Sequence, residues 1–387
     1  MGRGWMLGLM VLSLPAIASP TATWAEDYKP VVCKSAVTYA GAPLHAPLAP
    51  PLVAEVPRAA LDPATIARLE AGFIQAKAAT KAPALTAAVL VPGKGAWERT
   101  DSGDQPPMLF WASVGKTLIA VVVLQLAEAG KLKLEDPIGK YVAGVPNGDV
   151  VTIRDLLAHT GGLFSANEDL KARAEHRAHT LDEDLKIIAR HGAFSCPGER
   201  WRYSNTGYAL LGKVIETVDG RSWQDAVDAR IVKSLGLKSL RMLADGDRAE
   251  DVAKLVSAKD APMQPAWAGA AGPAVGSAGD MARVWAALLG GKLLKQDMVT
   301  TMFARLYPMF DSGSFYGLGV MAVEVPEPDG SKSLWLGHLG GAPGANAVVA
   351  YSVRDGAIVA AALTGDGSAA ATANLLLRQV RASSQER

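Results

Sequence analysis

The chain has 387 residues, and its 39 Lys and Arg nearly balance its 38 Asp and Glu, which leaves a net charge of +1 with His neutral. Such a chain, without a basic run, has nothing to hold a phosphate backbone, so we expect no nucleic-acid partner. Hydrophobic residues make up 49% and charged residues 20%, which supports a large core and excludes a disordered chain. At about 150 residues per domain, the length predicts two domains or one large composite domain.

The first residues have the pattern of an export signal. Arg3 supplies a positive start, an apolar run from Met6 to Ala18 follows, and small residues recur near Ala25. The apolar run is shorter than the about 20 residues that a membrane span needs. We therefore predict a signal peptide over residues 1–25, cleaved after Ala18 or Ala25. The mature protein is then periplasmic or secreted and has no stable membrane span.

The chain contains two cysteines, Cys33 and Cys196. In an oxidising compartment they can pair and tie the N-terminal part of the chain to its middle. Two separate buried thiols agree equally well with the sequence, because sequence alone does not place their Cα atoms at bridging distance. Neither cysteine has the C-x-x-C spacing that is typical of metal or redox chemistry.

Apolar patterning divides the chain into a strand-rich start, a helical middle and a strand-rich end. Residues 26–60 are rich in proline and predict an extended arm, and Asp62-Pro63 is typical of a helix start. Thr152 to Asp155 has the pattern of a capping box at another helix start. Strands are expected at 84–91, 96–100, 317–325, 332–336, 345–352 and 357–363, and further helices at 117–130, 181–189, 208–218, 223–234, 281–289 and 368–381.

This order of elements predicts one domain, over residues 61–381, that carries an insertion. Residues 61–130 and 315–381 supply strands and flanking helices, and we expect them to form one α/β layer. Residues 131–314 are mostly helical and are expected to be inserted into that layer. The chain has no fixed-period repeat and no long heptad run, which excludes a solenoid or a coiled coil.

Ser113 and Lys116 form the most informative short motif. They lie three residues apart at the start of a buried helix, so both side chains are expected on one face. A serine hydroxyl needs a base within hydrogen-bond reach, and a lysine in apolar surroundings loses part of its preference for the charged form. The amides at a helix start also suit a developing oxyanion. Ser-x-x-Lys is a weak signal by itself, but this is its only occurrence in the chain.

A second group of polar residues lies between 197 and 208. Tyr203 has a phenol that can accept or relay the serine proton where a nearby cation lowers its pKa. Asn205 has an amide that can hold a substrate carbonyl and hydrogen-bond the lysine. The alternative is that Asn205 merely caps a helix that begins at Gly207.

A third group, from Gly337 to Gly344, lies between two expected strands. Glycines there let the backbone approach a ligand closely, and the amide of Gly341 can complete a two-donor oxyanion hole with that of Ser113. The alternative is a glycine-rich hairpin that carries a surface histidine, His338.

The three motifs, in this order, resemble the class C β-lactamase-like serine hydrolases, which include D-alanyl-D-alanine carboxypeptidases, D-amino-acid amidases and esterases. The resemblance runs from about Leu61 to Arg381 and includes residues 133–138, 156–163 and 276–280. It implies an α+β fold of the β-lactamase/transpeptidase type, in which an antiparallel sheet is flanked by helices and a mostly helical region is inserted. The implied catalytic residues are Ser113 as nucleophile, Lys116 as its proton partner, Tyr203 as shuttle to the leaving group, Asn205 to orient substrate, His338 with its strand to line the site, and Gly341 for the oxyanion.

One departure from the family pattern bears on the substrate. Members that destroy β-lactams usually have Lys-Thr-Gly at the third motif, where this chain has His338-Leu339-Gly340. Leucine offers no hydroxyl to a substrate carboxylate, and a lost hydrogen bond to a charged group costs about 1.5–3 kcal/mol. We therefore expect an exported serine hydrolase that cleaves an ester or amide bond in preference to a β-lactam. The alternatives are a D-alanyl-D-alanine carboxypeptidase and a catalytically silent penicillin- or peptidoglycan-binding protein.

Other hydrolase classes fit less well. His176, His179 and His191 lie in one polar stretch, but their spacing lacks the H-E-x-x-H pattern of a metal hydrolase. The chain also lacks G-x-S-x-G, a P-loop and a dinucleotide-binding glycine pattern. We expect no metal and no cofactor, and a small-molecule or peptidoglycan-type substrate. The sequence makes no prediction of oligomeric state.

Overall fold

The computed structural model describes residues 28–385, except 245, 248, 249, 259, 260, 262 and 328, and leaves out the side chains of 382–385. The predicted signal peptide therefore lies outside the described residues. Within the described part of the chain, no helix is long and apolar enough to cross a membrane.

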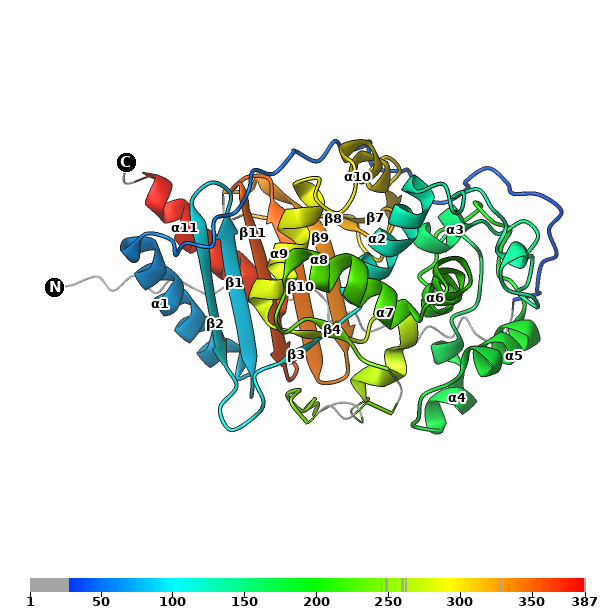
Figure 1. Ribbon diagram of the computed structural model, residues 1–387, viewed down its shortest axis with the longest axis horizontal. Helices are drawn as coiled ribbons and strands as arrows, with labels where there is room; N and C mark the ends of the chain where they lie inside the picture. Colours follow the sequence, from blue (N-terminus) through cyan, green and yellow to red (C-terminus); the bar gives the residue numbers. More distant parts are fainter. Residues whose placement is uncertain are drawn as a thin grey trace.

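An eight-stranded antiparallel sheet forms the centre of the molecule (Figure 1), in the order β2-β1-β11-β10-β9-β8-β7-β6. β1 comes from the start of the domain and pairs with β11 from its end, so distant parts of the sequence meet in one sheet. The strands are β1 (Leu85–Val91), β2 (Gly95–Asp101), β6 (Tyr307–Pro308), β7 (Ser314–Tyr316), β8 (Met321–Pro326), β9 (Lys332–Ala342), β10 (Ala345–Ser352) and β11 (Ala357–Thr364).

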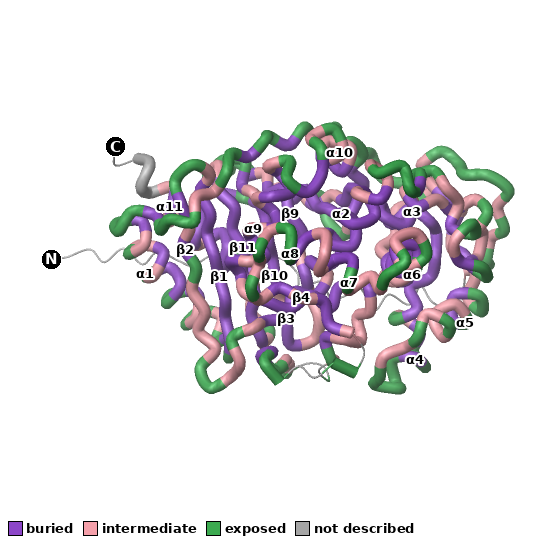
Figure 2. Tube along the Cα trace, in the orientation of Figure 1, coloured by how far each residue is buried: buried purple, intermediate pink, exposed green. Residues whose placement is uncertain are grey.

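Helices cover both faces of the sheet. α1 (Pro63–Thr80) and α11 (Ala369–Gln385) pack on one face, and α9 (Ala278–Leu289) packs on the other. Alternate residues of β1 therefore enter two different apolar clusters, with Val89 on the side of α1 and Ala88 on the side of α9. Figure 2 shows the central strands as buried along their length. Burial on both faces explains why the strand reads as a continuous apolar run.

The helical region lies beside the sheet and is centred on α2 (Gly115–Glu128), which packs against α6 (Asn205–Asp219). A second sheet, in the order β3-β5-β4, joins this region to β9, β10 and β11 through contacts of β3. These short strands were not expected, because two to four residues show no periodicity. The other elements are α3 (Ile153–Ala158), α4 (Leu170–Ala174), α5 (Leu181–His191), α7 (Trp223–Val227), α8 (Lys233–Leu235), α10 (Gln296–Met302), β3 (Leu109–Ala112), β4 (Arg241–Met242) and β5 (Ala274–Gly276).

The predicted α+β fold, with an antiparallel sheet flanked by helices, is confirmed, but several boundaries differ. The expected helix over 223–234 is interrupted by a π-helical turn at Asp228–Val232. β9 extends to Ala342, well beyond the expected end at 336, because main-chain pairing with β10 continues through its glycines. The third motif is therefore strand as far as Ala342, and Pro343 and Gly344 form the turn of a hairpin with β10. α6 begins at Asn205, so this residue is not the cap of a helix starting at Gly207.

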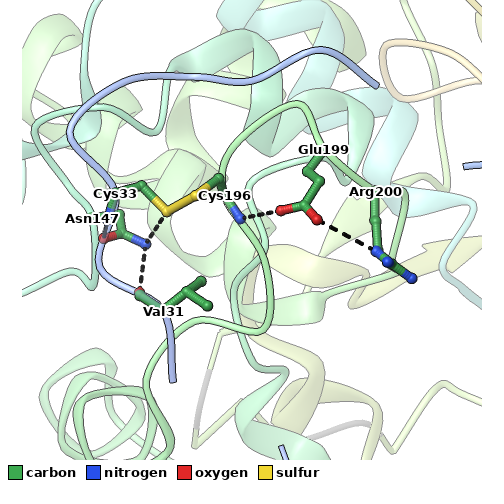
Figure 3. The surroundings of a disulfide bond; sticks show 6 residues. All are labelled: Val31, Cys33, Asn147, Cys196, Glu199 and Arg200. Carbon is green, nitrogen blue, oxygen red and sulfur yellow. Dashed lines mark hydrogen bonds and ion pairs between the residues drawn. A yellow bond between two sulfur atoms is a disulfide. The ribbon is translucent and has the colours of Figure 1, made fainter. Parts of the chain in front are cut away.

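Residues 28–62 run as an extended arm over the helical region and back to the sheet, drawn in blue in Figure 1. Its backbone is hydrogen-bonded along the way, for example from Val31 N to Ala193 O and from Leu48 N to Phe303 O. A disulfide joins Cys33 to Cys196 with the Cα atoms 5.7 Å apart, so the paired alternative for the two cysteines is the correct one. Figure 3 shows Asn147 against this bridge, donating to the carbonyl of Val31.

Candidate active site

Ser113 lies on the sharp turn between β3 and α2. The residue before it, Ala112, has a φ of 47°, a left-handed conformation that non-glycine residues rarely adopt. Tight backbone hydrogen bonds from Val114 N to Trp111 O and from Lys116 N to Ser113 O close the turn. Ser113 is partly exposed, whereas the helix that follows is almost entirely buried. The turn therefore leaves the hydroxyl accessible at the edge of a dry interior.

Two glycines allow other segments to contact this turn. A Cβ at Gly272 would lie 2.3 Å from the Ala112 carbonyl oxygen, and one at Gly340 would lie 2.3 Å from the Trp111 carbonyl oxygen. Neither position can hold a larger residue without displacing the backbone next to the serine. Because Gly340 packs there, the following residue of β9, Gly341, is held beside the segment that carries the Ser113 amide.

Lys116 is fully buried, and burial lowers the pKa of its ammonium well below the ordinary value. Its Nζ lies 3.1 Å from Ser113 Oγ, 2.7 Å from Asn205 Oδ1 and 2.6 Å from the carbonyl oxygen of Ala271. Both of the latter oxygens can only accept hydrogen bonds. If Lys116 is a neutral amine, its two N–H bonds can donate to these two oxygens. Its lone pair can then accept a hydrogen bond from the Ser113 hydroxyl.

Tyr203 is the second group beside the serine. Its phenol hydrogen-bonds Ser113, and Lys116 Nζ lies 4.9 Å from the centre of its ring. Burial raises the pKa of Tyr203, an effect only partly offset by the hydrogen bond to Ser113. From the sequence, proton uptake by this phenol is conditional on a nearby cation that lowers its pKa, and no such lowering by a cation is found for Tyr203. The phenol is a proton donor in the resting site.

Asn205 is oriented by a residue that the sequence analysis missed. Its Nδ2 donates to Asn167 Oδ1 over 3.0 Å, which directs its own Oδ1 toward Lys116. Ser165 supports both amides, since its hydroxyl donates to Asn167 and accepts from the backbone N–H of Asn205. Asn167 follows the motif at 156–163 by four residues, but no chemical pattern marks it, so only the tertiary contact identifies it.

His338 is buried, so the alternative of a surface histidine is wrong. Its Nδ1 lies 2.6 Å from the Leu339 carbonyl oxygen and must carry the proton, so its Nε2 accepts from the Tyr316 hydroxyl at 3.1 Å. Burial, with Lys116 nearby, lowers the pKa of His338 to about 3. The imidazole is neutral, and both of its nitrogens are engaged within the protein.

His159, from the motif at 156–163, packs against the ring of Tyr203. It is buried, and its ring centre lies 4.2 Å from that of Tyr203 and 4.5 Å from that of Tyr316. Its Nδ1 accepts from the backbone N–H of Ser204, and burial lowers the pKa of the imidazole well below its usual value. His159 is thus a second buried histidine whose lowered pKa favours the neutral form beside Tyr203.

The three histidines considered for a metal site lie in the helical region. His179 is 3.4 Å from Glu175, and His191 is 2.8 Å from Asp169 and stacks on Phe164. Among the residues that the structure describes, no three His, Cys, Asp or Glu side chains are grouped so as to hold a metal ion.

Comparison with known proteins identifies relatives over most of the chain. The sequence model of the Beta-lactamase family matches residues 71–382. PbpX of Bacillus subtilis (strain 168), named as a penicillin-binding protein, is 31% identical over 210 residues, which are 53% of this chain and 51% of PbpX. Esterase EstB of Burkholderia gladioli is 31% identical over 143 residues, 33% of this chain and 36% of the esterase. The chain thus spans about half the length of the first relative.

Solved structures with the same fold cover more of the chain. The D-stereospecific amidohydrolase of a Streptomyces species has a TM-score of 0.68 and 27% identity, covering 82% of this chain and 98% of that one. The D-amino acid amidase of Ochrobactrum anthropi SV3, solved with L-phenylalanine, has a TM-score of 0.70 over 82% of this chain and 99% of its own, at 22% identity. The predicted β-lactamase/transpeptidase type of fold is thereby confirmed.

Proposed function

Since this chain belongs to the Beta-lactamase family of hydrolases, we propose that it is an exported serine hydrolase that cleaves an ester or amide bond through an acyl-enzyme on Ser113. The observation that carries the proposal is the buried Lys116, whose Nζ lies 3.1 Å from Ser113 Oγ and has two other oxygens as acceptors for its N–H bonds. A neutral amine held this way is a general base aimed at a serine hydroxyl.

In the acylation step, Ser113 Oγ attacks the substrate carbonyl carbon and its proton passes to Lys116. As the bond to the leaving group breaks, Tyr203 gives its phenolic proton to the leaving oxygen or nitrogen and recovers a proton from Lys116. A phenol with a raised pKa is protonated before the reaction, as a donor to the leaving atom must be.

The tetrahedral intermediate carries a negative charge on the former carbonyl oxygen. The amides of Ser113 and Gly341 are the proposed donors to this oxygen, because Gly340 packs β9 directly against the turn that carries the serine. Asn205, held by Asn167, is the proposed amide that orients the substrate. In deacylation a water molecule gives a proton to Lys116 as its oxygen bonds to the acyl carbon. The bond from that carbon to Ser113 Oγ then breaks, and Oγ takes the proton from Lys116.

The residues of the third motif favour an ester or amide substrate that has no carboxylate group next to Leu339. Leu339 supplies no hydroxyl there, and His338 is neutral with both nitrogens engaged. A substrate carboxylate thus finds neither a cation nor a hydroxyl from these two residues. Export is supported by the disulfide between Cys33 and Cys196, since such bonds persist in oxidising compartments.

The test is intact mass spectrometry after treatment with a fluorophosphonate and, separately, with a penicillin. We expect one fluorophosphonate adduct on the wild type, none on Ser113→Ala, and the wild-type result on Ser35→Ala, a control at an exposed serine. We also expect hydrolysis of esters or amides to exceed that of β-lactams.

The outcomes separate the candidates. A fluorophosphonate adduct that remains in Ser113→Ala contradicts the proposed nucleophile. A penicillin adduct that persists on the wild type favours the carboxypeptidase, and one that clears quickly favours a β-lactamase. If the wild type forms no adduct with either reagent, the catalytically silent binding protein is the better interpretation.

A further inference from the structure

Three aromatic rings stand side by side, and one of them, Tyr203, hydrogen-bonds the proposed nucleophile. The ring centres of Trp201 and Phe310 are 5.4 Å apart, and that of Phe310 lies 6.3 Å from that of Tyr203. Trp201 and Tyr203 are 6.4 Å apart. We call these three side chains the aromatic wall. They come from two distant parts of the chain, because Phe310 belongs to the connection between β6 and β7.

The aromatic wall runs from the interior to the surface. Tyr203 is packed over Lys116 and hydrogen-bonds Ser113, whereas Phe310 is 48% exposed. Met309, the chain neighbour of Phe310, and Leu339 pack against the same large apolar cluster as Trp201 and Tyr203. A half-exposed phenylalanine next to partly buried rings leaves apolar surface open beside the reacting group.

The position of Tyr203 determines which part of a substrate meets this surface. In the proposed mechanism Tyr203 protonates the leaving atom, so the leaving group must lie against the Tyr203 side of the site. The aromatic wall continues outward from Tyr203. A leaving group larger than a few atoms therefore extends along Trp201 and Phe310.

The two arginines that flank Trp201 in the sequence are each paired with a glutamate. Arg202 donates to Glu168 over 2.7 Å with its guanidinium carbon 3.4 Å from the centre of the Phe194 ring, and Arg200 lies 3.6 Å from Glu199. His338 is neutral beneath the site. These side chains offer no unpaired cation to an anionic leaving group, whereas the wall offers aromatic faces.

We propose that the aromatic wall is the leaving-group subsite, and that Phe310 selects substrates whose leaving alcohol or amine is uncharged and aromatic. This inference rests on the proposed function, since it assumes an acyl-enzyme on Ser113. Phe310 is then a specificity-determining residue that lies outside the three sequence motifs.

The test compares kcat/KM for benzyl acetate and ethyl acetate, whose leaving alcohols have similar acidity but differ by a phenyl ring. We expect the wild type to favour the benzyl ester by about tenfold or more, in the range that an apolar contact supplies. Phe310→Ala should reduce this benzyl-to-ethyl ratio by about tenfold, and Phe310→Leu by less because an apolar side chain remains. The control Ile74→Ala, at a residue on α1 that is 58% exposed, should keep the wild-type ratio.

A second pair of esters, ethyl phenylacetate and ethyl acetate, varies the acyl group instead. We expect Phe310→Ala to leave this ratio as in the wild type. A change in the acyl ratio, with none in the alcohol ratio, overturns the assignment of the wall to the leaving group. An unchanged alcohol ratio in Phe310→Ala, in a protein that still labels at Ser113 with fluorophosphonate, overturns the subsite and leaves the proposed function standing. Loss of labelling in the wild type refutes both.

Discussion

The two segments that meet at the candidate site are held in different ways. The turn from Trp111 to Lys116 is enclosed by apolar side chains, and its lysine has no exposed surface. The segment from 192 to 205, which carries Tyr203 and Asn205, is mostly only partly buried, and its aromatic side chains pack against the outside of the apolar clusters. The first segment thus lies within the hydrophobic core, whereas most of the second lies at its edge.

Backbone hydrogen bonds and a disulfide, more than burial, hold the segment from 192 to 205 in position. Backbone amides of Phe194, Gly198 and Arg202 donate to the carbonyls of residues 162, 160 and 159, respectively. The N-terminal arm adds backbone bonds at 193, 197 and 199, and the disulfide joins Cys196 to the arm (Figure 3). The difference follows from chemistry: a neutral lysine requires a dry site, whereas groups that meet the substrate must remain accessible.

Removing the buried base should have the largest effect. We expect Lys116→Met to lower kcat/KM by about 10⁴-fold, the upper range for a general base, and to slow fluorophosphonate labelling of Ser113 in parallel. Lys213→Met, at an exposed lysine of α6, is the matched control and should retain activity. Normal labelling in Lys116→Met would show that burial of the lysine does not activate the serine.

In the segment from 192 to 205, the residue to test is Tyr203, the proposed proton donor. Tyr203→Phe should lower kcat/KM by about 10²- to 10³-fold, because the phenol is lost while the ring still packs on His159. The loss should be greater for an amide than for an aryl ester, since an aryloxide leaves without protonation. Equal losses on the two substrates, measured by steady-state kinetics, would contradict the role of Tyr203 at the leaving atom.

The pH dependence of kcat/KM should report the protonation of Lys116 in the buried segment. Lys116 acts as a base only when neutral, and burial lowers its pKa, so activity should fall as the pH drops through this lowered pKa, by about tenfold per pH unit below it. His338, with a pKa of about 3, stays neutral over the accessible range, and the raised pKa of Tyr203 keeps the phenol protonated. kcat/KM measured from about pH 5 to about pH 10 should therefore show an acid limb alone. A basic limb within that range would contradict the raised pKa of Tyr203, because it would show the phenol losing its proton there.

One added methyl group can disturb the close packing between β9 and the turn that carries Ser113. Gly340→Ala places a Cβ 2.3 Å from the Trp111 carbonyl oxygen, and we expect kcat to fall by about 10- to 100-fold as the turn shifts. In Gly207→Ala, on α6, the Cβ meets Leu156 O at an ordinary 3.5 Å, so activity should persist and the melting temperature should rise. Similar kinetics for the two variants would contradict the tight approach.

The disulfide should have the smallest effect on activity. The double variant Cys33→Ser with Cys196→Ser opens a loop of 163 residues, which should cost about 2–5 kcal/mol of unfolding free energy. While the protein remains folded, we expect kcat to fall only severalfold, because the polar bonds of residues 192–205 persist. Denaturant unfolding and kinetics below the melting temperature check both expectations. An inactive but normally stable variant would show that the bridge alone positions Tyr203.

Local sequence patterns determined much of the fold. The helix start at Asp62-Pro63 and the capping box at Thr152 depend on neighbouring residues alone, and both are present. Apolar runs located β1, β10 and β11 within a residue or two, because burial on both faces leaves a strong signal in the sequence. The same reasoning brought Ser113 and Lys116 together, since both lie within one turn of chain.

Tertiary structure alone decided which groups surround that turn. Ala271 and Asn167 lie 155 and 51 residues from Lys116 along the chain, and neither has a chemical pattern that predicts its contact with the site. The extension of β9 through Gly340 and the inward position of His338 also depend on neighbouring strands. Sequence names the groups that can carry protons. Their pKa values depend on burial, and only the assembled fold determines burial, because it brings apolar side chains from distant segments around the same atoms.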